Sequence, residues 1–235
     1  MSRDPSFPTH RLYGRSAGKP LSRTQAGRVD TLLPTLAIPA SAPGALDPAS
    51  LFEPPPRQVW LEIGFGGGEH LTGQAELHPD VGFLGAEPFL DGVAKALAEI
   101  EQRQLRNIRI RRGDARLMVE ELAAASIDRA FILFPDPWPK LRHRKRRLLQ
   151  PAFLQSLARV LKAGARVRFA TDWADYASRA LADLARDGRY SWTAEVAEDW
   201  RKPPADHVTT RYQEKRLGDC APVFLDCVFT PDGRD

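Results

Sequence analysis

The stretch Val59-Trp60-Leu61-Glu62-Ile63-Gly64-Phe65-Gly66-Gly67-Gly68-Glu69 decides the fold, because an apolar run leads directly into a glycine-rich turn. The run predicts a buried strand, and the turn predicts a nucleotide-type site at the start of a helix. A dinucleotide fingerprint needs a small residue where Glu69 stands, because the pyrophosphate approaches the backbone there. An acid at this position repels a pyrophosphate and suits a cationic ligand that carries no phosphate. At Gly64 and Gly66, the absence of a Cβ lets the backbone approach such a ligand.

Outward from this segment, short apolar runs alternate with helical patterns, which is typical of a parallel α/β sheet. Apolar residues recur at helical spacing within 89–104 and again within 151–161. The last two runs alternate apolar and polar residues with no obvious helix between them, which predicts a closing antiparallel pair. We therefore expect an α/β, Rossmann-like sheet of seven mostly parallel strands, with a C-terminal antiparallel hairpin and helices on both faces. This architecture resembles that of class I methyltransferases. The expected strands are 59–63, 81–86, 107–112, 127–134, 166–171, 190–197 and 222–229.

The chain has 235 residues, of which 43% are apolar and 27% charged, so it can bury a globular core. Residues 1–56 differ from the rest, because prolines interrupt them and no sustained helical pattern is present. We expect a basic, proline-containing N-terminal arm over 1–56, which is either disordered or partly ordered through an apolar patch at 29–38, and a single domain over 57–235. The arm's basic residues are expected to contact a polyanion; they are Arg11, Arg15, Lys19, Arg23 and Arg28.

The remaining composition bounds the class of protein. No apolar run approaches the roughly 20 residues that span a bilayer, and the N-terminal residues lead into no signal-peptide core. We therefore expect a cytoplasmic protein with no membrane partner. Cys220 and Cys227 are too few for a thiolate metal site, which predicts two inert thiols in a reducing compartment and no metal. A monomer and a homodimer both agree with the sequence.

Acidic residues follow the first three expected strands. Glu62 ends the first, Glu87 ends the second in Gly85-Ala86-Glu87, and Asp114 follows the third in Gly113-Asp114-Ala115. Ligands of open α/β sheets bind at the carboxyl ends of the strands, so the three acids should meet at one site. A carboxylate at Glu87 suits two ribose hydroxyls, and Asp114 or the neighbouring backbone at Ala115 suits an adenine amino group. With the glycine turn, this set favours S-adenosylmethionine.

The fourth strand leads into Phe134-Pro135-Asp136-Pro137-Trp138-Pro139, followed by a tract that holds six Lys or Arg between residues 140 and 147. Asp136 lies between two prolines, which should hold it rigidly beside the methyl group of the cofactor. A basic tract beside such a pocket predicts contacts to phosphates. The substrate is therefore expected to be a nucleic acid.

The motif F-P-D-P-W-P-K-x-R-H-x-K-R-R at 134–147 resembles the hallmark of the bacterial tRNA (guanine-N7)-methyltransferases. E-I-G-F-G-G-G-E at 62–69, G-A-E at 85–87, G-D-A at 113–115, T-D-W at 171–173 and T-R-Y-Q-E-K at 210–215 extend the resemblance over about 57–229. It implies methyl transfer from S-adenosylmethionine, with S-adenosylhomocysteine as product, to N7 of a guanine in tRNA, namely the variable-loop guanine at tRNA position 46. It implies cofactor contacts at Glu62, Glu87, Asp114 and Asp136. The implied substrate contacts are Lys140, Asp172, Thr210, Arg211, Tyr212 and Gln213, and the implied RNA-contacting tract is Arg142, His143, Arg144, Lys145, Arg146 and Arg147.

The sequence departs from the family at one position, because Gln213 stands where the family usually has Glu, and Glu214 follows it. Either Gln213 keeps the contact as an amide or a small slip brings in Glu214; we favour Gln213, whose amide can still bind the edge of guanine. Two other functions are carried as alternatives. One is a small-molecule methyltransferase with a merely solvated basic tract, and the other is a non-catalytic RNA-binding module with a vestigial cofactor pocket.

Methylation of guanine N7 requires positioning more than proton transfer, because N7 carries an in-plane lone pair and no proton. The product base is cationic, so a nearby carboxylate stabilises the charge as it develops. We assign this catalytic role to Asp136, helped by Asp172. Trp138 and Tyr212 are candidate stacking surfaces for a base turned out of the RNA, and core packing is their alternative role.

Overall fold

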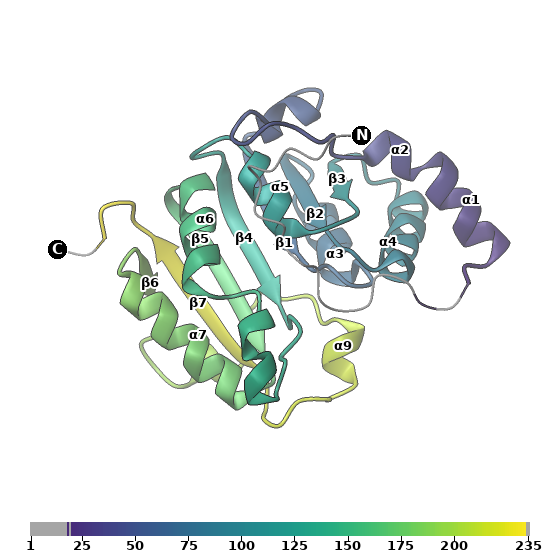
Figure 1. The fold of residues 1–235 in the computed structure, drawn as a ribbon. Helices are drawn as coiled ribbons and strands as arrows, with labels where there is room; N and C mark the ends of the chain where they lie inside the picture. Colours follow the sequence, from purple (N-terminus) through teal and green to yellow (C-terminus); the bar gives the residue numbers. More distant parts are fainter. Residues whose placement is uncertain (1–17, 19, 234–235) are drawn as a thin grey trace.

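The chain folds around one seven-stranded sheet (Figure 1), as seen in a computed structural model that describes residues 18 and 20–233. The strand order is β3-β2-β1-β4-β5-β7-β6. The first five strands are mutually parallel, and β7 is antiparallel to both β5 and β6, which confirms the predicted fold class. The strands are β1 Gln58–Ile63, β2 Val81–Ala86, β3 Ile108–Arg111, β4 Ile127–Leu133, β5 Leu161–Thr171, β6 Tyr190–Trp192 and β7 Val223–Phe229.

Two strands differ in length from the prediction. β5 begins at Leu161 rather than 166, and its first residues include exposed small ones, Ala163 and Gly164, which carry no apolar signal. β6 ends at Trp192 rather than 197, because the carboxylate of Asp199 accepts the backbone N–H groups of Glu195 and Val196 and turns the chain. The predicted hairpin is therefore present with one short strand.

Helices cover both faces of the sheet, as predicted, because side chains of consecutive strand residues point to opposite faces. In β1, Leu61 and Ile63 pack into one apolar cluster and Trp60 into the other. The first cluster is covered by α5 (Ala115–Glu121), α6 (Pro151–Val160) and α7 (Ala174–Asp187), and the second by α3 (Glu69–Leu77) and α4 (Leu90–Arg103). Within the ranges that the structure describes, none of the helices is long and apolar enough to cross a membrane. The shorter elements are η1 Pro48–Leu51, η2 Leu141–Arg146, α8 Glu198–Arg201 and α9 Arg211–Glu214.

The N-terminal segment contains a helix that the sequence analysis did not expect. α1 covers Arg23–Thr31 and α2 covers Leu33–Leu36, and α1 lies against α4 (Figure 1). Ser22 and Gln25 form a reciprocal capping box at the start of α1, a pattern that is visible in the sequence. Within the apolar patch 29–38, Leu36 and Ile38 are buried against the domain. The boundary at residue 56 stays a prediction, and Arg11, Arg15 and Lys19 lie outside the described residues.

Candidate functional site

The glycine turn between β1 and α3 lies at the carboxyl edge of the sheet and adopts a conformation that favours glycine. Gly64, Gly66 and Gly68 have φ angles of 73°, 55° and 84°. A Cβ on Gly68 would lie 2.6 Å from the Cβ of Ala96 on α4, so this glycine lets the turn pack on the helix. A Cβ on Gly66 would meet no protein atom within 4 Å. The turn therefore leaves open space beside the backbone of Gly66, as a ligand cradle requires.

A further glycine, outside the turn and not identified from the sequence, supports it. Gly92 lies in the first turn of α4, and a Cβ there would clash with the carbonyl oxygen of Gly66. The helix can therefore approach the cradle only without a side chain at this position. The sequence offers no special signal for it, because a glycine in a helical pattern identifies no partner.

Two buried carboxylates flank the cradle. Glu62 is 4% exposed and its Oε2 lies 2.7 Å from Nδ1 of the fully buried His70, a partner that the sequence analysis did not identify. Glu87 accepts the backbone N–H of Gly66 at 2.9 Å and that of Phe89 at 2.8 Å. Burial raises the pKa of Glu87 against the effect of these two bonds, and the charges of Asp136 and Glu62 add to the rise. Each oxygen of Glu87 keeps a further lone pair for a hydroxyl donor.

The third acid, Asp114, is engaged within its own helix. Its side chain caps α5 by accepting the N–H of Arg116 at 2.9 Å, and it pairs with the guanidinium of Arg116 at 2.6 Å. The carboxylate is therefore largely committed to structure. Of the two predicted adenine contacts, the backbone at Ala115 is free of this pairing, and both contacts stay predictions.

The loop after β4 holds Asp136 between two strained residues. Phe134 and Trp138 have φ angles of 50° and 42°, which residues other than glycine rarely adopt. The side chain of Asp136 is exposed, and partial desolvation by the surrounding atoms raises the pKa of its carboxyl. Burial and the charges of Asp172 and Asp136 together raise the pKa of Tyr212. Asp136 also raises the pKa of Glu87, and Phe134 of the same loop packs on Tyr212, so this loop lies near both the cofactor cradle and the predicted substrate motif.

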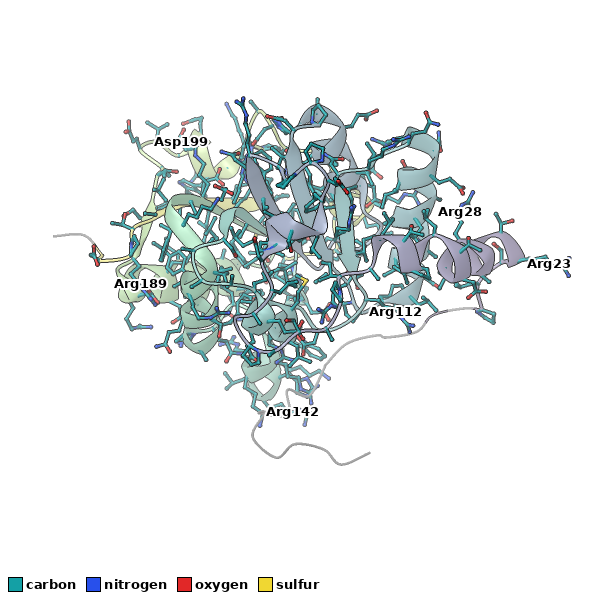
Figure 2. The ribbon with its side chains drawn as sticks, turned by 90° about the horizontal axis from the view of Figure 1, so that it is seen from above. Arg23, Arg28, Arg112, Arg142, Arg189 and Asp199 are labelled. Atoms are coloured by element: carbon teal, nitrogen blue, oxygen red, sulfur yellow. The ribbon has the colours of Figure 1, made fainter. Side chains whose placement is uncertain are left out.

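The basic tract forms η2 and projects from the molecule. Lys140, Arg142 and Lys145 are exposed. Figure 2 shows Arg142 at a projecting corner, with Arg112 between it and Arg28 in that view.

Arg146 lies over the ring of Trp138, with 4.9 Å from its Cζ to the ring centroid. Arg146 therefore covers one face of the Trp138 ring.

The structure corrects the prediction for Arg147. Its side chain is 4% exposed, its Nε donates to the carbonyl of Pro137 at 2.7 Å, and its Nη2 pairs with Asp175 at 2.7 Å. Its Cζ also lies 4.6 Å from the ring centroid of Tyr176. Arg147 therefore ties the Asp136 loop to α7 and is not available to RNA. Arg144 also pairs with Asp175, at 3.0 Å, but is itself 42% exposed.

We expect Arg147→Ala to lower the free energy of unfolding by about 1–3 kcal/mol, because the Pro137 carbonyl and Asp175 lose a buried donor. Urea denaturation measures this change. Arg142→Ala is the matched control: its side chain is exposed, so its effect should stay within about 0.5 kcal/mol. Equal midpoints for Arg147→Ala and the wild type would show that this arginine does not hold the loop.

The late motif lies beside a cavity at the same edge of the sheet. In Figure 1, α9 lies beyond the arrowhead of β4. The cavity has a volume of about 780 Å³, and Asp172, Gln213, Glu214 and Phe224 are among its lining residues. Asp172 is 4% exposed, and its Oδ1 has no hydrogen-bond partner among the described residues. A buried carboxylate oxygen without a donor predicts a ligand that supplies one.

The other residues of the late motif hold α9 in place. The hydroxyl of Thr210 caps the helix by accepting the N–H of Gln213 at 3.3 Å. Arg211 pairs with Glu69 at 3.2 Å and so connects α9 to the glycine turn. The ring of Tyr212 packs on Phe134, with 5.7 Å between centroids. The structure therefore brings the cofactor cradle, the Asp136 loop and the late motif together.

These residues fit a cationic, nucleoside-containing ligand at the cradle. The turn has room beside Gly66, and the buried carboxylates of Glu62 and Glu87 lie at this turn. The glycine turn contains no lysine that could bind a phosphate. Among the described residues, no group of three or more His, Cys, Asp or Glu side chains could hold a metal ion. The site is thus built from carboxylates, backbone groups and aromatic rings.

Comparison with known sequences gives concordant matches. The model of a family described as "Putative methyltransferase" matches residues 56–223. A tRNA (guanine-N(7)-)-methyltransferase of Caulobacter sp. (strain K31) is 55% identical over 218 residues, which cover 93% of this chain and 94% of the relative. A protein of the same name from Hyphomonas neptunium is 51% identical, with 92% of this chain and 98% of the relative covered.

Comparison with solved structures agrees on the fold. An antibiotic-related methyltransferase matches with a TM-score of 0.52 and 20% identity over 74% of this chain and 88% of its own. A 16S rRNA methyltransferase matches with a TM-score of 0.53 and 16% identity over 75% of this chain and 89% of its own. At these identities the likeness concerns the class I methyltransferase fold.

Proposed function

The chain belongs to the tRNA (guanine-N7)-methyltransferases, and from this premise we propose how its carboxyl-edge site transfers a methyl group from S-adenosylmethionine to N7 of a guanine in tRNA. One observation carries the proposal: the loop that holds Asp136 packs on the late motif through Phe134 and Tyr212, and the charge of Asp136 also raises the pKa of Glu87 in the cradle. A group held there can act on donor and acceptor together. The family resemblance supports the variable-loop guanine at tRNA position 46 as the methylated base, and the cytoplasm as the place where the protein acts.

The cradle residues have separate roles toward the cofactor. S-adenosylmethionine, when bound, supplies a sulfonium-activated methyl group. The backbone at Gly64 and Gly66 would lie along its amino-acid part, where Glu62 offsets positive charge. Glu87 would accept the ribose hydroxyls, and the backbone at Ala115 would meet the adenine. These assignments are supported by the position of their residues, which follow or end β1, β2 and β3.

The protein's contribution to the transfer is position and charge. Guanine N7 needs no general base, since it carries a lone pair and no proton. Holding acceptor and donor in near-attack geometry can lower the barrier by roughly 7–11 kcal/mol. The purine gains positive charge as the bond forms, and the carboxylate of Asp136 stabilises it. Asp172, buried with an unpaired Oδ1, provides a second negative group beside the base.

The direct test is to incubate the protein with labelled S-adenosylmethionine and unmodified tRNA and to map the methylated base. We expect label at N7 of a variable-loop guanine. Label on a small molecule with none on tRNA would favour the small-molecule methyltransferase, and tRNA binding without any transfer would favour the non-catalytic module. Label at a different guanine would contradict only the position.

Salt dependence of tRNA binding tests the surface around η2. If the exposed tract neutralises phosphates, the logarithm of affinity should fall with the logarithm of salt by about 0.7–0.9 per contact. Replacing Arg142 and Lys145 together by Ala should flatten this slope by about one to two units and leave cofactor affinity unchanged. Filter binding across a salt series measures it.

The matched control removes two exposed charges elsewhere. Arg57 and Arg106 precede β1 and β3, so they lie at the opposite, amino edge of the sheet. Replacing both by Ala keeps the same net charge as the test variant and should leave the slope unchanged. If both pairs flatten the slope equally, the tract has no special part in RNA binding.

A further inference from the structure

The segment between α8 and α9 is anchored to the sheet by ion pairs. Asp206 bridges two arginines, with 2.6 Å to Nη2 of Arg129 on β4 and 2.7 Å to Nη1 of Arg168 on β5. Burial alone would raise the pKa of Asp206, but the bonds from Arg168 and Arg129 outweigh it and lower the pKa to about 2. Asp206 is therefore ionised at any physiological pH, and its neighbour in the chain, His207, is held in a fixed place.

His207 touches the late motif through a single hydrogen bond. Its Nε2 lies 2.8 Å from Oε1 of Gln213, and its ring packs on Phe224 with 5.0 Å between centroids. Its Nδ1 is buried and has no hydrogen-bond partner among the described residues. Burial lowers the pKa of the imidazole, against the opposing effect of the bond to Gln213, so the ring is neutral at pH 7.

The neutral ring determines which way the amide of Gln213 is turned. A neutral imidazole carries one N–H, and a buried N–H without an acceptor costs more than a buried lone pair without a donor. The hydrogen therefore lies on Nε2, which donates to Oε1 of Gln213. The amide nitrogen of Gln213 then points its two hydrogens away from His207, and Gln213 lines the cavity that also contains Asp172.

We propose that His207 is a positioning residue that fixes the amide of Gln213 as a hydrogen-bond donor, so that Gln213 and Asp172 together recognise the Watson–Crick edge of guanine. This inference rests on the proposed function. Guanine presents an acceptor, O6, beside a donor, N1–H, which match the amide N–H of Gln213 and the free Oδ1 of Asp172. Adenine presents the reverse pair, a 6-amino donor beside the N1 acceptor. Adenine would therefore leave both protein groups buried and unpaired, and N7 of guanine stays free on the opposite edge.

The test compares two substitutions at His207 in the full-length protein, with methylation of unmodified tRNA as the assay. His207→Leu removes the donor and should lower kcat/KM for tRNA about tenfold, the effect of about one hydrogen bond. His207→Gln places an amide N–H near the position of Nε2 and should restore most of the loss. The KM for S-adenosylmethionine should not change in either variant. His78→Leu, at another half-buried histidine packed on an aromatic ring, is the control.

A double-mutant cycle separates positioning from mere packing. If His207 acts through Gln213, then His207→Leu should have no further effect on kcat/KM in a Gln213→Leu background. Additive losses, or no rescue by His207→Gln, would overturn the inference, as would an unchanged kcat/KM in a folded His207→Leu. Failure of the proposed function is distinct from these results, because the wild type itself would then place no methyl group on guanine N7.

Discussion

Replacing Asp136 by asparagine is expected to slow methyl transfer by about 10²-fold, the usual order for removing one charge-stabilising group. The amide keeps the shape of the side chain but cannot offset positive charge on the purine. Cofactor affinity should stay within a few-fold, because Glu62, Glu87 and the glycine turn are untouched. Single-turnover methylation of tRNA with saturating cofactor measures the chemical step.

Asp80→Asn makes the same chemical change at an exposed site in the turn before β2, at the far edge of the sheet. It should transfer methyl groups at the wild-type rate. A rate for Asp136→Asn equal to that of this control would remove Asp136 from the mechanism. A parallel loss of cofactor affinity would instead assign Asp136 to binding.

The substitution Gly66→Val should abolish binding of S-adenosylmethionine, with affinity at least about 10²-fold weaker. The valine side chain would fill the open space beside the turn, where a Cβ meets no protein atom within 4 Å. Its φ of 55° also strains a β-branched residue by about 1–3 kcal/mol. Isothermal calorimetry gives the affinity, and circular dichroism shows that the fold persists.

Two further variants distinguish blocking from strain. Gly66→Asn tolerates the positive φ but still fills the space, so it should lose binding with little loss of stability. Gly164→Val introduces only the backbone strain, because Gly164 has a φ of 80° and open space around its Cβ position near the start of β5. This variant should bind S-adenosylmethionine as tightly as the wild type. If a folded Gly66→Val variant binds S-adenosylmethionine with unchanged affinity, the turn at Gly66 does not hold the cofactor.

The mostly parallel sheet with its closing antiparallel pair, and the place of the site, followed from local patterns in the sequence. Glu62 and Glu87 were predictable because both end apolar runs, and parallel strands bring their carboxyl ends to one edge. The start of β5 could not be predicted, because Ala163 and Gly164 are small and exposed although they lie in a strand. Helix α1 buries none of its residues, so apolar periodicity could not reveal it; only its capping box could.

The rest of the site depends on contacts between distant parts of the chain. Arg147 looks like its basic neighbours in sequence, and only the packing of α7 brings Asp175 and Tyr176 against it. His70 and His207 are single histidines in unremarkable surroundings, yet their rings lie 5.8 Å apart beneath the site. Such partners are set by tertiary packing, which no local spacing encodes.

The N-terminal segment also bridges one outer strand of the sheet. The N–H of Ile38 donates to the carbonyl of Ile110 on β3 at 2.9 Å, and the guanidinium of Arg111 binds the carbonyls of Ile38 and Pro39. The opposite outer strand, β6, is only three residues long. Unpaired strand edges are templates on which copies of a protein add to one another and aggregate. With one outer strand bridged by the N-terminal segment and the other only three residues long, the sheet offers little free edge on which a strand of another copy could add.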